Sequence, residues 1–358
     1  MSEHPHVFVA MSGGVDSAVA AAQLMAEGYH VTGIYMDTWK DPAWDSVSQA
    51  GSSALISAEK TANLLGIPFV SLDIRDQFFK QVVRGFINQY LAGQTPNPCL
   101  FCNPQVKWGI LQAYAIEHGA DYFATGHYAR IERLETGLVR LLRGLDESKD
   151  QSYVLCMLTQ GQLQKSLLPL GGFTKAWVRM QAQKLDLPSA EREDSQDLCF
   201  LGTIDYRDFL GRYAPEAFQP GEIVTLDGGV VGQHEGLALY TVGQRKGIRV
   251  AAAEPYYVVE KDVDHNRLVI GHATRVTRNA LTANRANWIA GKMPEDGEMV
   301  LAMVRYRAKP AWACFFQVSE QEFRLEFVEQ LRGISPGQVA AVYMDEECLG
   351  GGVIQSAG

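Results

Sequence analysis

Residues 7–17 read VFVAMSGGVDS, and this stretch decides the fold. The apolar run at its start is typical of a short buried strand, and residues 18–27 favour a helix that ends at Gly28. The two glycines between strand and helix let the backbone approach an anion closely, because they carry no Cβ. The helix N-terminus adds free N–H groups and the positive end of the helix dipole. The stretch therefore predicts a phosphate-binding turn.

The residues of this turn narrow the class of nucleotide site. The turn has no lysine and does not fit G-x-x-x-x-G-K-[ST], so it is not the loop of common NTPases. It also lacks the G-x-G-x-x-G spacing of dinucleotide-binding folds. Ser-Gly-Gly-x-Asp-Ser resembles the PP-loop of ATP pyrophosphatases, which bind ATP, release pyrophosphate and leave AMP on an oxygen of their substrate. A simple glycine turn between strand and helix is the alternative interpretation.

The rest of the N-terminal part alternates strands and helices. Strands are expected at residues 29–36, 69–72 and 122–125, and helices at residues 54–65, 78–91 and 106–118. Asn103 is the expected N-cap of the last helix, with Pro104 at its first position. This rhythm predicts a doubly wound parallel sheet with helices on both faces. Ligands of such sheets bind at the carboxyl ends of the strands, so residues 12–17, Met36 and Gly126 should share one crevice.

Beyond about Thr203 the character of the chain changes to short β-rich runs separated by turns. We expect an α/β domain at residues 1–202, a small central β-rich domain at 203–272 and a C-terminal antiparallel β-barrel at 273–358. In the last of these, a strand is expected over residues 301–306. Alternation along that strand would place Arg305 and Arg307 on one face and Tyr306 on the other.

Composition describes an ordinary globular protein. The chain has 358 residues, of which 47% are hydrophobic and 20% charged. Its net charge of −9 argues weakly against a nucleic-acid partner, but phosphate contacts need only a local basic patch. Basic residues near Arg305 could form such a patch or a solvated surface. No apolar run reaches membrane-spanning length and residues 1–5 do not resemble a signal peptide, which predicts a cytoplasmic enzyme with no membrane partner.

Six cysteines are present, and their uneven spacing does not suggest a disulfide framework. Cys99 and Cys102 lie in a proline-ordered loop that leads into a helix N-terminus, a position that lowers a thiol pKa. Cys102 is therefore expected to be a thiolate near neutral pH. Cys199 ends the polar segment 193–199. A Cys-x-x-Cys pair alone fits a redox, metal-binding or structural role. A four-ligand zinc site is disfavoured, whereas three cysteines leave an iron–sulfur cluster open.

Taken together, these motifs make the chain resemble the bacterial tRNA-specific 2-thiouridylases, and the resemblance covers nearly the whole chain. Those enzymes make 2-thiouridine at the wobble position of certain tRNAs. The stretches that carry the resemblance are residues 13–17, 95–103, 124–128, 142–146, 149–153, 194–200, 209–213, 241–247 and 348–352. As a set they are far more specific than the PP-loop alone.

The resemblance implies ATP and Mg²⁺ as cofactors, and tRNA and a persulfide donor as partners, the donor being a cysteine desulfurase or a sulfur-relay protein. It implies a persulfide on Cys199 and a partner thiol at Cys102. It implies ATP contacts at Ala10, Met11, Ser12, Gly13, Gly14, Val15, Asp16, Ser17, Met36 and Gly126. It implies that Asn97, Pro98 and Cys99 border the target base. It implies further tRNA contacts at His127, Lys149, Asp150, Gln151, Arg305, Tyr306 and Gln338.

One position departs from the family pattern. Some members carry Asp where this chain has Cys99, and that Asp has been viewed as an acid/base aid to the catalytic thiol. A thiol with its free pKa of about 8.5 is a poorer acid/base than a tuned carboxylate. Either the role is dispensable, or members with this Cys-x-x-Cys pair work differently. A cluster held by Cys99, Cys102 and Cys199 would be one such difference.

Two rival functions remain open from the sequence. Another ATP pyrophosphatase, such as an amide ligase with a nitrogen nucleophile, would explain the loop but gives Cys102 and Cys199 no task. A non-catalytic RNA-binding protein with an inherited nucleotide fold would leave both the loop and the thiols unexplained. Pyrophosphate release that depends on tRNA would separate all three hypotheses.

Overall fold

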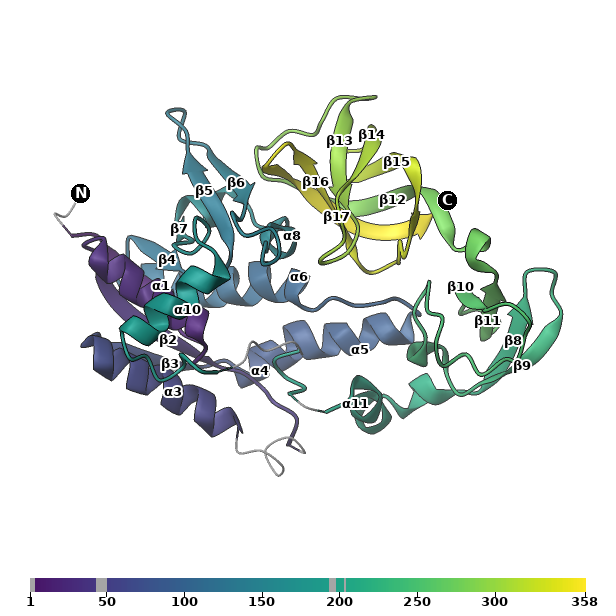
Figure 1. Cartoon of the computed structure of the whole chain (residues 1–358), viewed down its shortest axis with the longest axis horizontal. Coiled ribbons are helices and arrows are strands. Elements are labelled where there is room, and N and C mark those ends of the chain that lie inside the picture. Colours follow the sequence, from purple (N-terminus) through teal and green to yellow (C-terminus); the bar gives the residue numbers. More distant parts are fainter. Residues whose placement is uncertain (1–3, 43–49, 193–197, 203) are drawn as a thin grey trace.

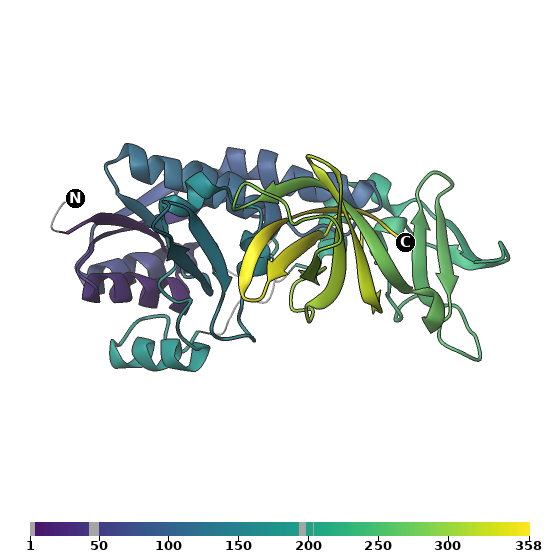
Figure 2. The same cartoon turned by 90° about the horizontal axis from the view of Figure 1, so that it is seen from above.

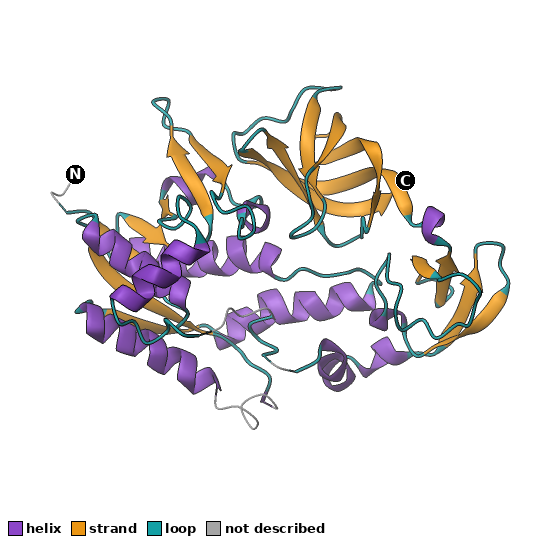
Figure 3. Ribbon diagram, viewed as in Figure 1, coloured by secondary structure: helices purple, strands orange, loops and turns teal. Residues whose placement is uncertain are grey.

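The computed structural model describes residues 4–42, 50–192, 198–202 and 204–358 (Figure 1). Part of the polar segment before Cys199 and the boundary residue 203 lie outside these ranges. The N-terminal part of the chain mixes helices and strands, whereas the C-terminal part consists mainly of strands (Figure 3). Within the described ranges, every helix is too short or too polar to cross a membrane.

The N-terminal layer is a parallel sheet of five strands in the order β3-β2-β1-β4-β7. From edge to edge its strands are β3 (Phe69–Asp73), β2 (His30–Asp37), β1 (His6–Ala10), β4 (Tyr122–Ala124) and β7 (Ser166–Leu167). The two-residue strand β7 was not predicted, because so short a run has no readable alternation. The apolar run of β1 is explained by its central place, since a central parallel strand is covered on both faces.

Helices cover both faces of this sheet, and the alternation of β1 shows how. Val7 and Val9 pack on one face with α1 (Val15–Ala26) and α10 (Lys175–Lys184). Phe8 points to the opposite face and joins a core with Phe78 and Phe123. α3 (Ala50–Leu65) packs against Met11 and Tyr35 near the end of β1. The predicted doubly wound sheet is therefore confirmed.

Two long helical stretches cover the face of Phe8, and each contains π-helical turns. The first runs through α4 (Arg75–Phe78), the π-helix η1 (Phe79–Val83) and α5 (Arg84–Leu91). The second runs through α6 (Cys99–Cys102), the π-helix η2 (Asn103–Leu111) and α7 (Gln112–Glu117). In Figure 1, α5 extends from the sheet toward the central β domain.

The predicted start of the second stretch is wrong. The helix begins at Cys99 with Pro98 as its N-cap, so Asn103 lies inside the helix rather than at its start. Asn103 is buried, and its side-chain N–H donates to the Val154 carbonyl oxygen over 2.8 Å. The wide π-helical turns accommodate Pro104, whose ring would clash with the carbonyl four residues earlier in an α-helix.

The remaining helices of the described chain are short. They are α8 (Ser152–Leu155), α9 (Gln160–Gln164), α11 (Tyr206–Tyr213), and the 3₁₀ turns η3 (Pro215–Phe218), η4 (Leu237–Leu239) and η5 (Ala273–Arg275). The central domain is a sheet in the order β10 (Tyr257–Asp262), β11 (Arg267–Gly271), β8 (Gly221–Thr225), β9 (Val230–His234).

The C-terminal strands form the predicted antiparallel barrel, which the pairing of β12 with β17 closes. Its strands in spatial order are β12 (Thr277–Trp288), β15 (Glu322–Arg332), β14 (Ala311–Ser319), β13 (Met299–Met303), β16 (Val339–Met344) and β17 (Glu347–Ala357). Aromatic side chains fill its interior, where the rings of Phe315 and Phe323 stack with their centres 5.5 Å apart.

A hairpin of the N-terminal part extends the barrel sheet. β5 (Ala129–Arg133) and β6 (Val139–Arg143) pair with each other, and β6 pairs antiparallel with the start of β17. Arg140 on the hairpin forms an ion pair of 2.7 Å with Glu347 on the barrel. The barrel therefore joins the N-terminal α/β part through a shared sheet, and Figure 2 shows the two side by side.

Candidate active site

The turn after β1 is folded by its own polar groups. The Ser17 hydroxyl donates to the Gly14 carbonyl oxygen over 3.0 Å and accepts from the Ser12 backbone N–H over 3.1 Å. Gly13 has a positive φ of 76°, and a Cβ there would overlap the Ala54 carbonyl oxygen. Gly14 is the N-cap of α1 with no side chain in the way, so the first-turn N–H groups of α1 stay open to an anion.

Asp16 lies in the first turn of α1 and is held by two residues from elsewhere in the chain. The Tyr128 hydroxyl donates to its Oδ1 over 2.7 Å, and the Lys175 ammonium bonds the same oxygen over 2.6 Å. Lys175 is only 8% exposed. Because its ammonium contacts Asp16, α10 supplies the cation that the turn itself lacks. No pattern in the sequence indicates this meeting, because Lys175 lies far along the chain in an ordinary helix.

The other predicted nucleotide residues lie at the same edge of the sheet. β1, β2 and β4 are parallel neighbours, so Ala10, Met36 and Gly126 all lie at or just beyond carboxyl ends. A Cβ on Gly126 would lie 2.8 Å from the Asp16 carbonyl carbon, so only glycine lets this backbone pack on α1. Met11 is buried, and its backbone N–H donates to Ile34 over 2.8 Å, so only its backbone can border a ligand. The nucleotide contacts remain predictions that this arrangement fits.

ATP and Mg²⁺ suit the groups at this edge. Open N–H groups, two serine hydroxyls and the nearby Lys175 ammonium favour a polyphosphate. The Asp16 carboxylate and the Ser17 hydroxyl are the oxygen donors that Mg²⁺ prefers.

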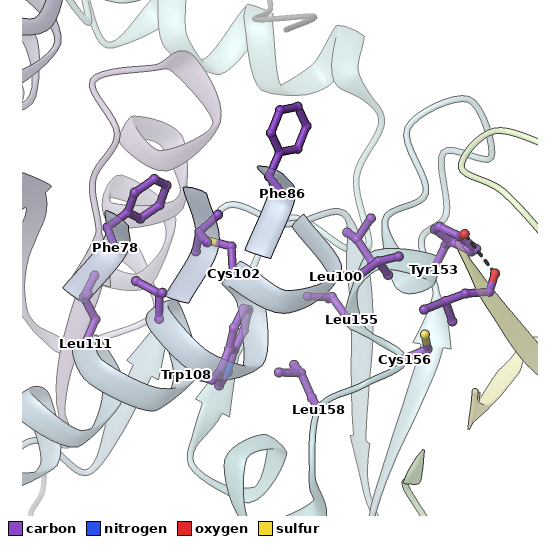
Figure 4. Packing of buried hydrophobic residues seen from close by; sticks show 14 of the residues in the cluster. Phe78, Phe86, Leu100, Cys102, Trp108, Leu111, Tyr153, Leu155, Cys156 and Leu158 are labelled. Atoms are coloured by element: carbon purple, nitrogen blue, oxygen red, sulfur yellow. Dashed lines mark hydrogen bonds between the residues drawn. The ribbon is translucent and has the colours of Figure 1, made fainter. Parts of the chain in front are cut away.

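The two cysteines of the Cys-x-x-Cys pair have opposite environments. Cys99, at the first position of α6, is exposed, whereas Cys102 is buried. Figure 4 shows Cys102 among apolar side chains, including Phe78, Phe86 and Trp108. The next candidate, Cys199, is exposed and follows the undescribed residues 193–197.

The protonation state of Cys102 corrects a prediction. Burial raises the pKa of the Cys102 thiol to about 12, and nearby Lys107 only partly offsets this. Cys199 is exposed when the whole residue is considered, but burial of its sulfur atom raises the thiol pKa to about 11. Burial likewise raises the pKa of Cys99. The expected thiolate at neutral pH is therefore wrong, because desolvation outweighs the helix N-terminus.

The three thiols nevertheless lie near one another. The charges of Cys99 and Cys199 raise the pKa of Cys102, and that of Cys99 raises the pKa of Cys199. Over the described ranges, however, no three His, Cys, Asp or Glu side chains are arranged to hold a metal ion. The structure therefore gives no support to an iron–sulfur cluster on Cys99, Cys102 and Cys199.

His127 lies just after β4 and is buried. Its Nδ1 lies 2.6 Å from the Thr125 hydroxyl, and its Nε2 lies 3.4 Å from the Lys107 ammonium. Burial lowers the pKa of His127 well below its usual range, so the ring is neutral. Its predicted contact with tRNA stays a prediction, but in this structure the ring contacts protein groups instead.

Residues 149–151 fold the connection between β6 and α8. Asp150 is buried and accepts hydrogen bonds of 3.0 Å from the Gly144 and Ser152 backbone N–H groups. Gln151 accepts from the Tyr128 backbone N–H over 3.0 Å, which fixes the residue that contacts Asp16. Lys149 is half-buried in the turn before them. Asp150 and Gln151 therefore have structural partners beside any contact with RNA.

Arg305 and Tyr306 lie on the barrel, but the predicted strand is wrong there. β13 ends at Met303, and Arg305 to Arg307 form a turn in which Arg307 has a positive φ of 62°. Strand alternation therefore does not apply. The Arg307 guanidinium lies 5.3 Å from the centre of the Tyr306 ring. Exposed Arg305 lines a cavity of about 310 Å³ between the barrel and residues 241–244.

Gln338 connects the barrel to the cysteine loop. Its side-chain N–H donates to the Thr95 carbonyl oxygen over 2.8 Å, and the Thr95 N–H donates to Pro336 over 3.0 Å. Asn97 and Pro98 follow directly and lead into α6. The barrel thus holds the loop that carries the residues predicted to border the target base.

Comparisons with known proteins agree with this architecture. Family models match a tRNA methyl transferase HUP domain over residues 5–203, a tRNA methyl transferase PRC-barrel domain over 207–272 and an aminomethyltransferase beta-barrel domain over 278–354. The chain is 46% identical over 356 residues to the tRNA-specific 2-thiouridylase MnmA of Heliobacterium modesticaldum, covering 97% of this chain and 92% of that protein. It is 42% identical over 356 residues to the tRNA-specific 2-thiouridylase MnmA of Carboxydothermus hydrogenoformans, covering 98% of this chain and 97% of that protein.

Among solved structures, the NMN synthetase of Francisella tularensis covers 54% of this chain and 67% of that chain. Its TM-score is 0.34 at 17% identity, a likeness too slight to bear on fold or function.

Proposed function

The chain belongs to the family of tRNA-specific 2-thiouridylases, and we propose that it replaces the C2 oxygen of the wobble uridine of tRNA with sulfur at the expense of ATP. The observation that carries the proposal is the meeting, in one domain, of an anion-binding PP-loop with the neighbouring thiols Cys102 and Cys199. A phosphate site alone would fit many ligases. A thiol pair beside it fits sulfur transfer.

The first step activates a poor leaving group. The uracil O2 attacks the α-phosphorus of ATP, a P–O bond forms and pyrophosphate leaves. Backbone N–H groups at the start of α1 and the Lys175 ammonium are placed to stabilise the departing charge. Mg²⁺, held by Asp16 and Ser17, would supply further charge neutralisation.

The second step delivers sulfur from a persulfide on Cys199, which is exposed and so accessible to a donor protein. In one route the terminal persulfide sulfur attacks C2 and AMP leaves. The Cys102 thiolate then attacks Cys199 Sγ, the S–S bond breaks and the sulfur stays on C2. In the other route the Cys102 thiolate first attacks Cys199 Sγ, the S–S bond breaks and hydrosulfide is released; the hydrosulfide then attacks C2 and AMP leaves. Both routes leave a Cys102–Cys199 disulfide, which an external dithiol reduces.

The target base must leave the anticodon loop to reach this edge of the sheet. Loop nucleotides are unpaired, so extruding one costs little. Asn97, Pro98 and Cys99 lie at the start of α6 beside the thiols, and the barrel holds their loop through Gln338. We therefore propose that this loop borders the base and that the barrel contacts the RNA around it.

The test measures pyrophosphate release from ATP with and without tRNA, followed by detection of thiolated tRNA on a mercury-containing gel. We expect release only with a tRNA that carries a wobble uridine, and a retarded product once a sulfide source is present. Release with an amine acceptor and no tRNA would assign the chain to a nitrogen ligase. Binding of tRNA without any release would assign it to the RNA-binding proteins.

A further inference from the structure

Lys107 is a cation that the proposed chemistry has not used. It lies on the π-helix η2, five positions after Cys102. Its ammonium is 3.4 Å from His127 Nε2, and His127 Nδ1 is 2.6 Å from the Thr125 hydroxyl. An ammonium can only donate, so Nε2 accepts and the neutral ring carries its proton on Nδ1, which donates to Thr125. Thr125 and His127 therefore hold Lys107 in place without cancelling its charge.

The π-helix explains why Lys107 lies on the same side of the helix as Cys102. Its hydrogen bonds join residues five apart, as the bond from the Gln112 N–H to the Lys107 carbonyl shows. Cys102 and Lys107 have this same spacing, so they lie on one side of the helix rather than being rotated apart as in an α-helix.

The charge interactions at the thiol site also indicate that Lys107 acts on the cysteines. Lys107 lowers the pKa of Cys99, of Cys102 and of Cys199. Lys40 acts on Cys199, where its effect is smaller than that of Lys107. Among the described cations, Lys107 is the one whose influence reaches all three thiols.

We propose that Lys107, positioned by the neutral ring of His127, is the counter-cation of the sulfur anion that forms at Cys102 and Cys199. The inference rests on the proposed function for the need to form that anion. An unpaired charge among apolar side chains such as Phe78 and Trp108 is strongly disfavoured. A fixed ammonium offsets this unfavourable free energy when the Cys102 thiol loses its proton to solvent. The same cation stabilises a hydrosulfide or persulfide anion at that place.

The experiment measures alkylation of Cys102 and Cys199 by iodoacetamide between pH 7 and pH 10, with peptide mass spectrometry to assign each thiol. It needs neither ATP nor tRNA, so its outcome is independent of whether the chain thiolates RNA. We expect Lys107→Met to slow alkylation of Cys102 at fixed pH by about tenfold, which corresponds to about one unit of pKa. Lys107→Arg, which keeps the charge, should restore most of the rate.

Three comparisons keep the test decisive. Lys80→Met, at an exposed site on η1, should leave both rates unchanged. His127→Ala, which frees the ammonium, should slow Cys102 less than Lys107→Met does. Alkylation rates that are equal in Lys107→Met and the parent, at matched thermal stability, would overturn the proposal. The proposal also fails if Lys107→Met weakens tRNA binding alone, because Lys107 would then be a phosphate contact.

Discussion

The PP-loop and the thiol site lie in the same domain, but the turn of the loop is folded mainly by bonds among its own residues, whereas the thiol site combines distant segments. In the loop, Ser12, Gly14 and Ser17 bond one another within six residues, and the helix whose open N–H groups suit an anion begins there. In the thiol site, Cys102 comes from α6 and Cys199 from a segment about a hundred residues later. The loop is built for charge, whereas burial holds Cys102 protonated.

This difference has a chemical meaning. A site for ATP must accept a highly charged ligand at once, so open N–H groups serve it well. A thiol that will form a disulfide is safer when it is buried and protonated, because the thiolate is the reactive form. Both thiols have raised pKa values, so each needs a nearby cation to form its anion, although Cys199 is exposed as a residue whereas Cys102 is buried.

The largest expected effect is on the thiols. Cys199→Ala and Cys102→Ala should each abolish tRNA thiolation, because each removes a sulfur atom that the proposed transfer requires. Cys156→Ala, at a fully buried core position, should leave thiolation largely intact. Thiolated tRNA is read on a mercury-containing gel. Full thiolation by the Cys199→Ala protein would show that Cys199 takes no part in the reaction, and the comparison of the two regions would then not hold.

The next effect is on the loop. Gly126→Ala should lower tRNA-dependent pyrophosphate release by at least about tenfold, since its Cβ would lie 2.9 Å from the Ser17 N and shift α1. Filter binding of tRNA should stay close to that of the parent. Gly172→Ala is the matched control, because a Cβ there meets no atom within 4 Å. Normal release by Gly126→Ala would mean that the loop is less rigid than its contacts indicate.

A third effect concerns pH. Because the pKa of Cys102 is about 12 and that of Cys199 about 11, both thiols are protonated at neutral pH. Alkylation of each should therefore rise about tenfold per pH unit from pH 7 to pH 10 without a plateau, with Cys199 the faster. Stopped alkylation and mass spectrometry measure both rates. A plateau for Cys102 near pH 8 would show that the thiol is far more acidic than its burial implies.

The smallest effect is expected on the barrel. Arg305→Ala should weaken tRNA binding by about 1 kcal/mol and reduce the salt slope by about one unit, because one phosphate contact is lost. Arg324→Ala, on β15 of the same barrel and paired with Glu326, should change neither quantity. A salt titration measures both. If Arg305→Ala and the parent protein bind tRNA with the same affinity and the same salt slope, Arg305 is an ordinary solvated surface residue.

Sequence reasoning worked best where structure is local. The strands around residues 7–10, 30–37 and 69–73 were predicted to within a residue or two, because short runs rich in apolar and β-branched residues are typical of strands. It failed where packing overrides a local signal. Asn103 has the residue type of an N-cap, yet the buried contact with Val154 places it inside a helix. Arg305 continues an alternating pattern, yet the strand ends before it.

The sequence by itself determined the PP-loop, because glycines, hydroxyls and a helix start within a few residues fix their own geometry. It also determined the family, through motifs spread along the chain. Only the tertiary structure decided which distant side chains meet: Lys175 with Asp16, and Lys107 with His127. It alone decided that Cys102 is protonated, because a pKa depends on how much water the whole fold removes from the thiol.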